Sequence, residues 1–218
     1  MIPLLGSCQK KYNAPPFNDY ETKIRKLPQE TERIIIPKEW QKMDSLSFLR
    51  FKEANHVIID ADSIPSWIVN FNKTEAIYSQ FGKIKSIPIK IGNLKDLKKI
   101  VFFSHSIEKI PETICNLENI EYLSFWSNKL KVIPACLFKL KNLKFLDLMD
   151  NDIEELPKEI CELENLEEIR LDGNKIEELP EEIFELKNLK RISLGGNPLV
   201  NPAQIKKKFE DRGIKVVL

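Results

Sequence analysis

Hydrophobic and polar positions repeat with a period of 23 residues along most of the chain. In the copy that begins at Leu166, apolar residues first recur at every second position. An asparagine and an apolar–proline pair follow, and apolar residues then recur at every third position. The first part predicts a short strand with one buried face, and the part after the proline predicts a 3-10 or short helical turn. Equivalent copies begin at Leu97, Ile120, Leu143, Leu166 and Leu189.

Two columns of residues recur in register with this pattern. The asparagine column contains Asn128, Asn151, Asn174 and Asn197, with His105 one copy earlier. The apolar–proline column contains Ile64-Pro65, Ile87-Pro88, Ile110-Pro111, Ile133-Pro134, Leu156-Pro157 and Leu179-Pro180. Because an asparagine amide both donates and accepts, stacked copies are expected to satisfy buried backbone groups in a ladder, with His105 substituting in it. Gly82 stands in this column in the copy from Thr74 to Asp96, so we expect a looser stack there.

The full motif, LxxIxLxxNxIxxLPxxIxxLxxL, resembles the leucine-rich repeat, in the Leu-Pro type seen in bacterial proteins that include those of spirochaetes. The resemblance covers residues 46–199. It implies an α/β solenoid, a curved stack with a concave parallel β-sheet and short 3-10 or helical turns on the convex side. No copy buries its apolar side alone, so the copies must stack on one another.

The first residues contain a second motif. Leu4-Leu5-Gly6-Ser7-Cys8 resembles the site at which a bacterial lipoprotein signal is cut before a lipid-modified cysteine, although the chain has no basic segment or full-length apolar run before it. Two interpretations stay open. Residues 1–8 are a remnant of a lipoprotein signal with lipid attached at Cys8, or they are an ordinary frayed N-terminus.

The ends of the chain depart from the repeat. Ile35-Ile36-Pro37 imitates the apolar–proline pair without a full copy, and the first degenerate copy starts with a strand-like stretch at 46–51 and runs to Thr74. Terminal copies must cover an open core and are therefore atypical. The predicted organisation is residues 1–8 as the signal remnant, 9–45 as tether and N-terminal cap, 46–199 as repeats, and 200–218 as a C-terminal cap helix and extended end.

Charge narrows the classes of partner. The chain has 34 basic and 33 acidic residues, a net charge of +1. Residues 151–190 hold fourteen acidic and five basic residues, a net of −9, so the remainder carries +10. We interpret this segment as a solvated face, with a field that steers a basic partner as the alternative. The chain has no basic stripe with interleaved aromatics, so we expect no nucleic-acid partner.

Cysteine and histidine positions predict neither catalysis nor metal binding. Cys115 and Cys161 share a repeat phase two copies apart, roughly 10 Å, which exceeds the reach of a disulfide. With Phe138 and Phe184 in the same column, they predict a buried layer of alternating small and large side chains. Lacking a disulfide framework, the sequence fits the cytoplasm without excluding secretion. It contains no CxxC pair, nucleophile–histidine–acid pattern, P-loop or dinucleotide motif, so we expect a non-enzyme without cofactor or metal.

Candidate binding residues come from outward strand positions. The third, fifth and seventh positions of each copy are expected to point out of the concave face. Large apolar side chains are unexpected there, and a patch of several hundred Å² marks an interaction surface. The predicted partner-binding residues are Phe103, Tyr122, Trp126, Phe145 and Met149, with Val101, Asp147 and Arg170 beside them. A polar rim is predicted at Asp147, Glu168, Arg170 and Asp172.

These residues predict a monomer that binds a protein or peptide, with an apolar small ligand as one alternative. In another, the rings pack sideways on each other or meet the N-terminal cap. Function divides similarly. The first hypothesis is a secreted or outer-surface bacterial protein that engages a host or envelope partner and meets a membrane only through an N-terminal lipid. The second is a cytoplasmic scaffold similar to the Leu-Pro repeat adaptors that bind signalling GTPases. The third is a structural spacer without a specific ligand.

Overall fold

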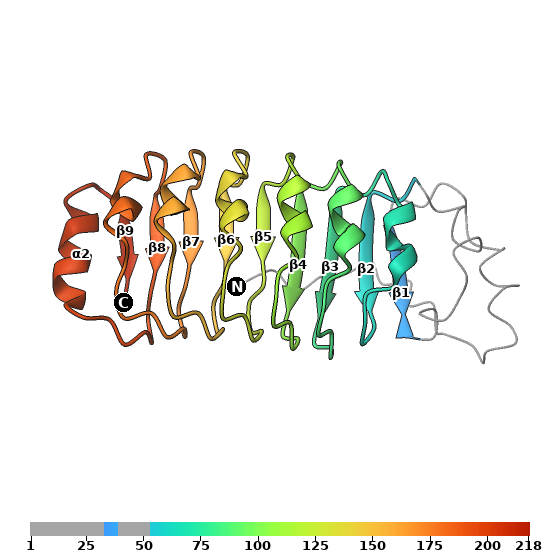
Figure 1. Ribbon diagram of the computed structural model, residues 1–218, viewed down its shortest axis with the longest axis horizontal. Helices are drawn as coiled ribbons and strands as arrows, with labels where there is room; N and C mark the ends of the chain where they lie inside the picture. The colour runs from blue at the N-terminus through green and yellow to red at the C-terminus, as the bar shows by residue number, and fades with distance from the viewer. Residues whose placement is uncertain (1–32, 39–52) are drawn as a thin grey trace, which may run out of the picture.

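A computed structural model describes residues 33–38 and 53–218 of the chain. Within these residues, nine strands form one uncurled parallel sheet in which each strand pairs with the next in sequence (Figure 1). The strands are β1 (Arg33–Pro37), β2 (His56–Asp60), β3 (Ala76–Gln80), β4 (Lys99–Phe103), β5 (Tyr122–Ser124), β6 (Phe145–Asp147), β7 (Glu168–Arg170), β8 (Arg191–Ser193) and β9 (Lys215–Val217). The predicted leucine-rich-repeat stack is confirmed.

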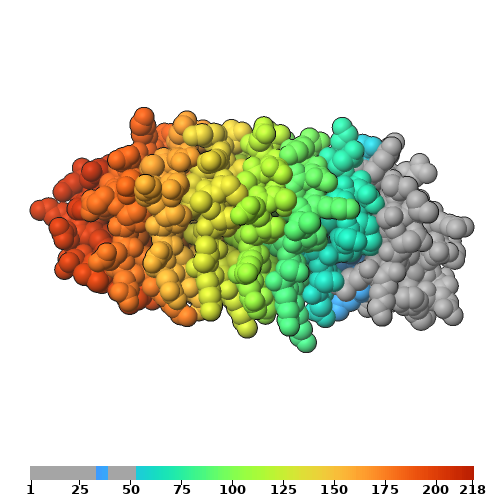
Figure 2. Space-filling view, in the orientation of Figure 1, coloured from blue at the N-terminus to red at the C-terminus, as the bar shows by residue number. Residues whose placement is uncertain are grey.

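Short 3-10 helices return the chain from one strand to the next. They are η4 (Ser66–Asn70), η5 (Ile89–Asn93), η6 (Glu112–Asn116), η7 (Ala135–Lys139), η8 (Lys158–Glu162) and η9 (Glu181–Glu185). A proline of the apolar–proline column directly precedes each one. Proline fixes φ near −65° and lacks an N–H for a strand ladder, so it ends the extended segment and starts the turn. Figure 2 shows the copies as successive bands along one elongated body.

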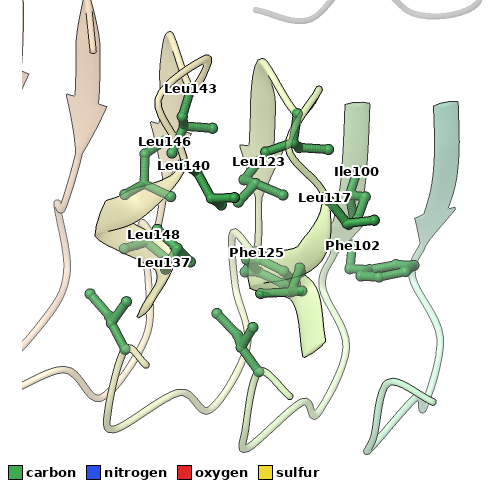
Figure 3. Packing of buried hydrophobic residues seen from close by; sticks show 14 of the residues in the cluster. Ile100, Phe102, Leu117, Leu123, Phe125, Leu137, Leu140, Leu143, Leu146 and Leu148 are labelled. Carbon is green, nitrogen blue, oxygen red and sulfur yellow. The ribbon is translucent and has the colours of Figure 1, made fainter. Parts of the chain in front are cut away.

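The core lies between the sheet and the 3-10 helices. Inward residues of neighbouring strands form continuous columns, for example Ile100, Leu123 and Leu146, which are paired in register and fully buried (Figure 3). Leucines from the turns, such as Leu117 and Leu140, pack against them from the other side. Each copy therefore buries its apolar side against the next copy, as the solenoid requires.

The N-terminal end differs from the sequence-based interpretation. The stretch Ile35-Ile36-Pro37 belongs to strand β1 and is not an apolar–proline turn, because Ile34 and Ile36 are buried and β1 pairs with β2 along its length. The spacing from β1 to β2 is 23 residues, but that from β2 to β3 is only 20. The predictions for residues 1–32 and for a strand at 46–51 fall outside the described residues.

The C-terminal end carries a helix and a final strand. Helix α2 (Pro202–Glu210) lies within the segment predicted as a cap helix, and Gly213 adopts the left-handed backbone conformation three residues after it ends. Phe209 is fully buried, with its ring centroid 4.6 Å from that of Phe184 in η9. Within residues 33–38 and 53–218, no helix is long and apolar enough to span a bilayer.

The asparagine ladder forms as predicted. The Asn151 amide nitrogen donates to the carbonyls of Phe125, Leu148 and Met149 at 2.9 to 3.1 Å, and its oxygen accepts from the backbone N–H of Leu130 at 3.0 Å. Asn128 and Asn174 repeat all four bonds, and Asn197 repeats three of them. One side chain in each copy thereby satisfies backbone groups of two copies.

His105 occupies the asparagine column without joining the ladder, which corrects the expected substitution. It is buried, and neither ring nitrogen has a partner in full hydrogen-bond geometry. Burial lowers the pKa of the imidazole, and the backbone of Ser79 and Gly82 acts in the opposite direction. The ring fills the space beside Gly82, where an added Cβ would lie 2.8 Å from His105 Cε1. The two copies keep their backbone hydrogen bonds, for example from the Ser106 N–H to the Ile84 carbonyl, and the packing of the ring over the glycine takes the place of the asparagine bonds.

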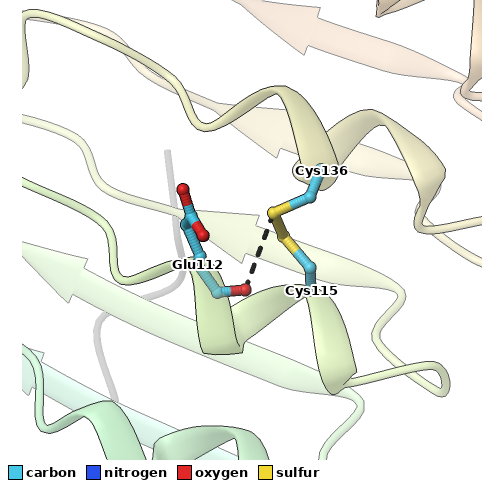
Figure 4. Close-up of a disulfide and its surroundings, with 3 residues drawn as sticks. All are labelled: Glu112, Cys115 and Cys136. Atoms are coloured by element: carbon cyan, nitrogen blue, oxygen red, sulfur yellow. Dashed lines mark hydrogen bonds between the residues drawn. A yellow bond between two sulfur atoms is a disulfide. The ribbon is translucent and has the colours of Figure 1, made fainter.

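The cysteines correct a second expectation. Cys115 in η6 and Cys136 in η7 form a disulfide, with Cα atoms 5.7 Å apart (Figure 4). Cys136 stands two positions earlier in its turn than Cys115 does, so the two cysteines differ in repeat phase, and yet Cys136 faces Cys115 of the preceding copy. Cys115 is half-buried rather than part of a closed layer, and Cys161 is a free thiol.

We expect Asn151→Ala to reduce the free energy of unfolding by about 2–3 kcal/mol, because buried backbone groups of two copies lose their partner. Urea denaturation measures the change. Asn165→Ala is the matched control, since its exposed side chain makes one hydrogen bond, to the Lys141 carbonyl. Equal losses for the two variants would contradict the ladder's role.

The double variant Cys115→Ser/Cys136→Ser should lose about 2–4 kcal/mol of stability, because the unfolded chain is no longer constrained by the loop of the disulfide. Cys161→Ser serves as the control and should match the wild type. Urea denaturation without reductant measures the stability of both variants. If a reductant leaves the free energy of unfolding of the wild type unchanged, the disulfide is contradicted.

Candidate functional site

The first row of outward side chains, here called the tyrosine row, consists of Tyr78, Lys99, Tyr122, Phe145 and Arg170. Strand register places Lys99, Tyr122 and Phe145 side by side in the third position. The rings of Tyr122 and Phe145 stack with centroids 4.3 Å apart. Lys99 Nζ lies 4.0 Å from the Tyr122 centroid, and the Arg170 guanidinium carbon lies 4.9 Å from that of Phe145. The stack is thus closed at both ends by cations of the chain itself.

The second row, here called the tryptophan row, consists of Phe81, Phe103, Trp126 and Asp150. The Phe103 and Trp126 rings stack with centroids 4.3 Å apart, and Phe81 meets Phe103 edge-on at 4.8 Å. Trp126 Nε1 donates to Asp150 Oδ2 at 2.8 Å. Met149 follows in the same column and is half-buried. The rings therefore pack sideways on each other, as one alternative anticipated, while Phe103 and Trp126 keep intermediate exposure.

Phe81 was not predicted from the sequence. It is 74% exposed, the most exposed of the large apolar side chains in the described part of the chain. It also adopts a left-handed backbone conformation, with φ of 54°, at a turn position filled elsewhere by Ser104, Ser127, Asp150, Gly173 and Gly196, all with positive φ. This conformation costs on the order of 1–3 kcal/mol for a bulky residue. The signal in the sequence was a phenylalanine in a column of small and polar residues.

The row between the two stacks is buried, which corrects the prediction that it faces solvent. Val101, Ser124 and Asp147 occupy the fifth position, and their exposed fractions are 5%, 2% and 2%. Ring stacks on both sides fill the space beside these shorter side chains. Asp147 therefore does not belong to an exposed polar rim.

Asp147 is a buried carboxyl group beneath the aromatic rows. Burial raises its pKa from 3.8 to about 6, although its hydrogen bond from the Met149 N–H and the nearby Arg170 guanidinium act in the opposite direction. Burial, reinforced by Asp147, also raises the pKa of the Tyr122 hydroxyl to about 12. The tyrosine ring therefore stays neutral and presents its face to cations at physiological pH.

The rest of the predicted rim is half-buried and internally paired. Arg170 Nε donates to Glu168 Oε1 at 2.7 Å, and Arg191 Nε lies 3.7 Å from the same oxygen. Asp172 accepts hydrogen bonds from the Ser193 hydroxyl and, at 3.0 Å, from the Gly195 N–H. Among the described residues, no three His, Cys, Asp or Glu side chains gather as a metal site would require.

Comparisons with known proteins agree with this fold. Residues 134–207 match the family model described as a leucine-rich repeat region. No curated protein matches the chain by sequence.

Solved structures include three informative neighbours. A leucine-rich-repeat protein of Leptospira interrogans has a TM-score of 0.72 and 22% identity, over 81% of this chain and 51% of that one. An internalin of Listeria monocytogenes has a TM-score of 0.59 and 16% identity, over 80% and 56%. A plant peptide hormone receptor, RGFR1 in complex with RGF2, has a TM-score of 0.67 and 23% identity, over 81% and 30%. The likeness at these identities is one of fold, and the chain spans at most 56% of each neighbour's length.

The raised pKa of Asp147 predicts a pH dependence of stability. The folded state holds this proton more tightly than the unfolded chain, so the stabilisation is complete below about pH 4 and is lost as the pH rises through about 6, by roughly 3 kcal/mol. Asp147→Asn does not ionise and should therefore gain stability relative to wild type between pH 4 and pH 7.5. Urea denaturation at both pH values measures this gain, and a constant difference between the two proteins would contradict it.

Proposed function

We propose that this chain, which is a leucine-rich-repeat protein, is a non-enzymatic interaction module that binds a protein or peptide on the outward face of its sheet. The observation that carries the proposal is the tryptophan row, in which Phe81, Phe103 and Trp126 form a continuous cluster of rings that is exposed or half-buried. Aromatic side chains with this much accessible area are the usual centres of protein interfaces.

Two further observations support a binding role. Phe81 has a strained backbone conformation although its side chain is largely exposed to solvent, so burial of the ring contributes little to offset the strain. Backbone strain of this kind concentrates at functional positions. The fold neighbours include a plant receptor whose structure contains a bound peptide hormone. The ligand of that receptor is its own, and the likeness at 23% identity is one of fold.

The disulfide is evidence about the cellular compartment of the protein. Disulfides persist in secreted and envelope proteins and are rare in the reducing cytoplasm. The bond between Cys115 and Cys136 therefore favours the hypothesis of a secreted or surface bacterial protein over that of a cytoplasmic scaffold. A lipid attached at Cys8 would hold such a protein at a membrane. The nucleotide sequence upstream of Met1 tests this, because an in-frame basic segment followed by an apolar run is expected for export.

The binding proposal predicts that Trp126→Ala removes partner affinity. Wild-type protein is used to select binders from a random peptide library displayed on phage, and the selected peptides are synthesised and titrated by calorimetry. Trp126→Ala should weaken these peptides by at least about thirtyfold, the loss that a hot spot of about 2 kcal/mol produces. Peptides that bind both proteins equally would contradict the site.

The matched control is Phe184→Ala. Phe184 is also a half-buried ring that packs against another aromatic, here at a tilt of 45°, but it lies in η9 on the opposite side of the sheet. This variant should bind the selected peptides like the wild type. Thermal unfolding of both variants, followed by circular dichroism, separates a lost contact from a lost fold.

A further inference from the structure

The two aromatic rows differ in whether their rings already hold a cation. In the tyrosine row, Lys99 and Arg170 lie over the rings of Tyr122 and Phe145. In the tryptophan row, no lysine or arginine of the described chain lies over Phe81, Phe103 or Trp126. The first row is therefore complete within the chain, whereas the stacked Phe103–Trp126 pair of the second row has no cation of the described chain beside it.

A carboxylate stands at the end of the unmatched row. Asp150 is exposed, and its Oδ2 accepts the Trp126 indole N–H. Its Oδ1 lies over Gly173, at 2.3 Å from where a Cβ would stand, so the neighbouring copy has no side chain there. In the part of the chain that the structure describes, Asp150 makes no ion pair.

Two half-buried carboxylates between residues 151 and 170 are neutralised by lysines of adjacent copies. Asp152 pairs with Lys175 at 2.6 Å, and Glu167 pairs with Lys190 at 2.7 Å. Asp150 differs from these two carboxylates in having no ion-pair partner among the described residues and in accepting a hydrogen bond from an aromatic ring. The segment 151–190, with its net charge of −9, adds a negative field beside it that favours the approach of a basic ligand.

We propose that the tryptophan row is an arginine subsite, at which a guanidinium of the partner stacks on the Phe103–Trp126 rings and donates to the Asp150 carboxylate. The inference rests on the proposed function and names the chemistry of its partner, a peptide segment that carries arginine. Arginine suits the site better than lysine, because a planar guanidinium stacks on a ring while its N–H groups reach a carboxylate in the same plane.

The test is a double-mutant cycle with the phage-selected peptides. Arginine is expected in the selected sequences, and its replacement by citrulline, which is nearly isosteric but uncharged, should weaken binding at least about tenfold. Asp150→Asn, which keeps an acceptor for the Trp126 N–H, should weaken the arginine peptide similarly. The citrulline peptide should bind both proteins with nearly equal affinity, because the two losses report one interaction.

Asp152→Asn is the matched control, since this carboxylate is already paired with Lys175 and should leave the affinity unchanged. Two results would overturn the arginine subsite and leave the binding site in place. One is that the selected peptides require Trp126 but lack arginine. The other is that replacing arginine by citrulline costs the same affinity on the wild type and on Asp150→Asn. Peptides that do not require Trp126 would overturn the proposed function itself.

Discussion

The asparagine ladder is the interaction on which the rest of the molecule depends. Each asparagine bonds to backbone groups of its own copy and of the preceding one, so neighbouring copies are held in one register. A slip would leave several buried donors and acceptors unpaired, at a cost of about 1–3 kcal/mol each. Apolar columns supply most of the burial, but they do not by themselves select a register. The polar ladder supplies that selection.

The outward face inherits its geometry from this register. Paired strands lie about 4.8 Å apart, which is also close to the distance at which aromatic rings stack. Rings at the same position of adjacent strands are therefore brought to contact by the backbone alone. The centroids of Tyr122 and Phe145, and those of Phe103 and Trp126, both lie 4.3 Å apart. Little further organisation is needed to build a rigid aromatic surface on such a sheet.

The sequence predicted the features that recur with the 23-residue period and missed contacts between residues at different positions of the repeat. The strands, the turns after proline and the columns of outward residues follow from counting in steps of 23. The disulfide was missed because Cys115 and Cys136 are 21 residues apart and so stand in different columns. Phe81 was missed because its turn position lies outside the strand alternation. The burial of Asp147 depends on the length of its neighbours' side chains, which an alternating pattern does not encode.

The disulfide between η6 and η7 also has a consequence for how the solenoid opens. Repeat proteins unfold through boundaries between copies, and each boundary opens with its own probability. The boundary at Gly82 and His105 has no ladder bond, which makes it the natural place for N-terminal copies to separate. The next turns toward the C-terminus are covalently joined, so the copy that carries Phe103 and the copy that carries Trp126 open together or remain closed. Separation at this boundary would remove Phe81 from the tryptophan row but would leave the Phe103–Trp126 stack in place.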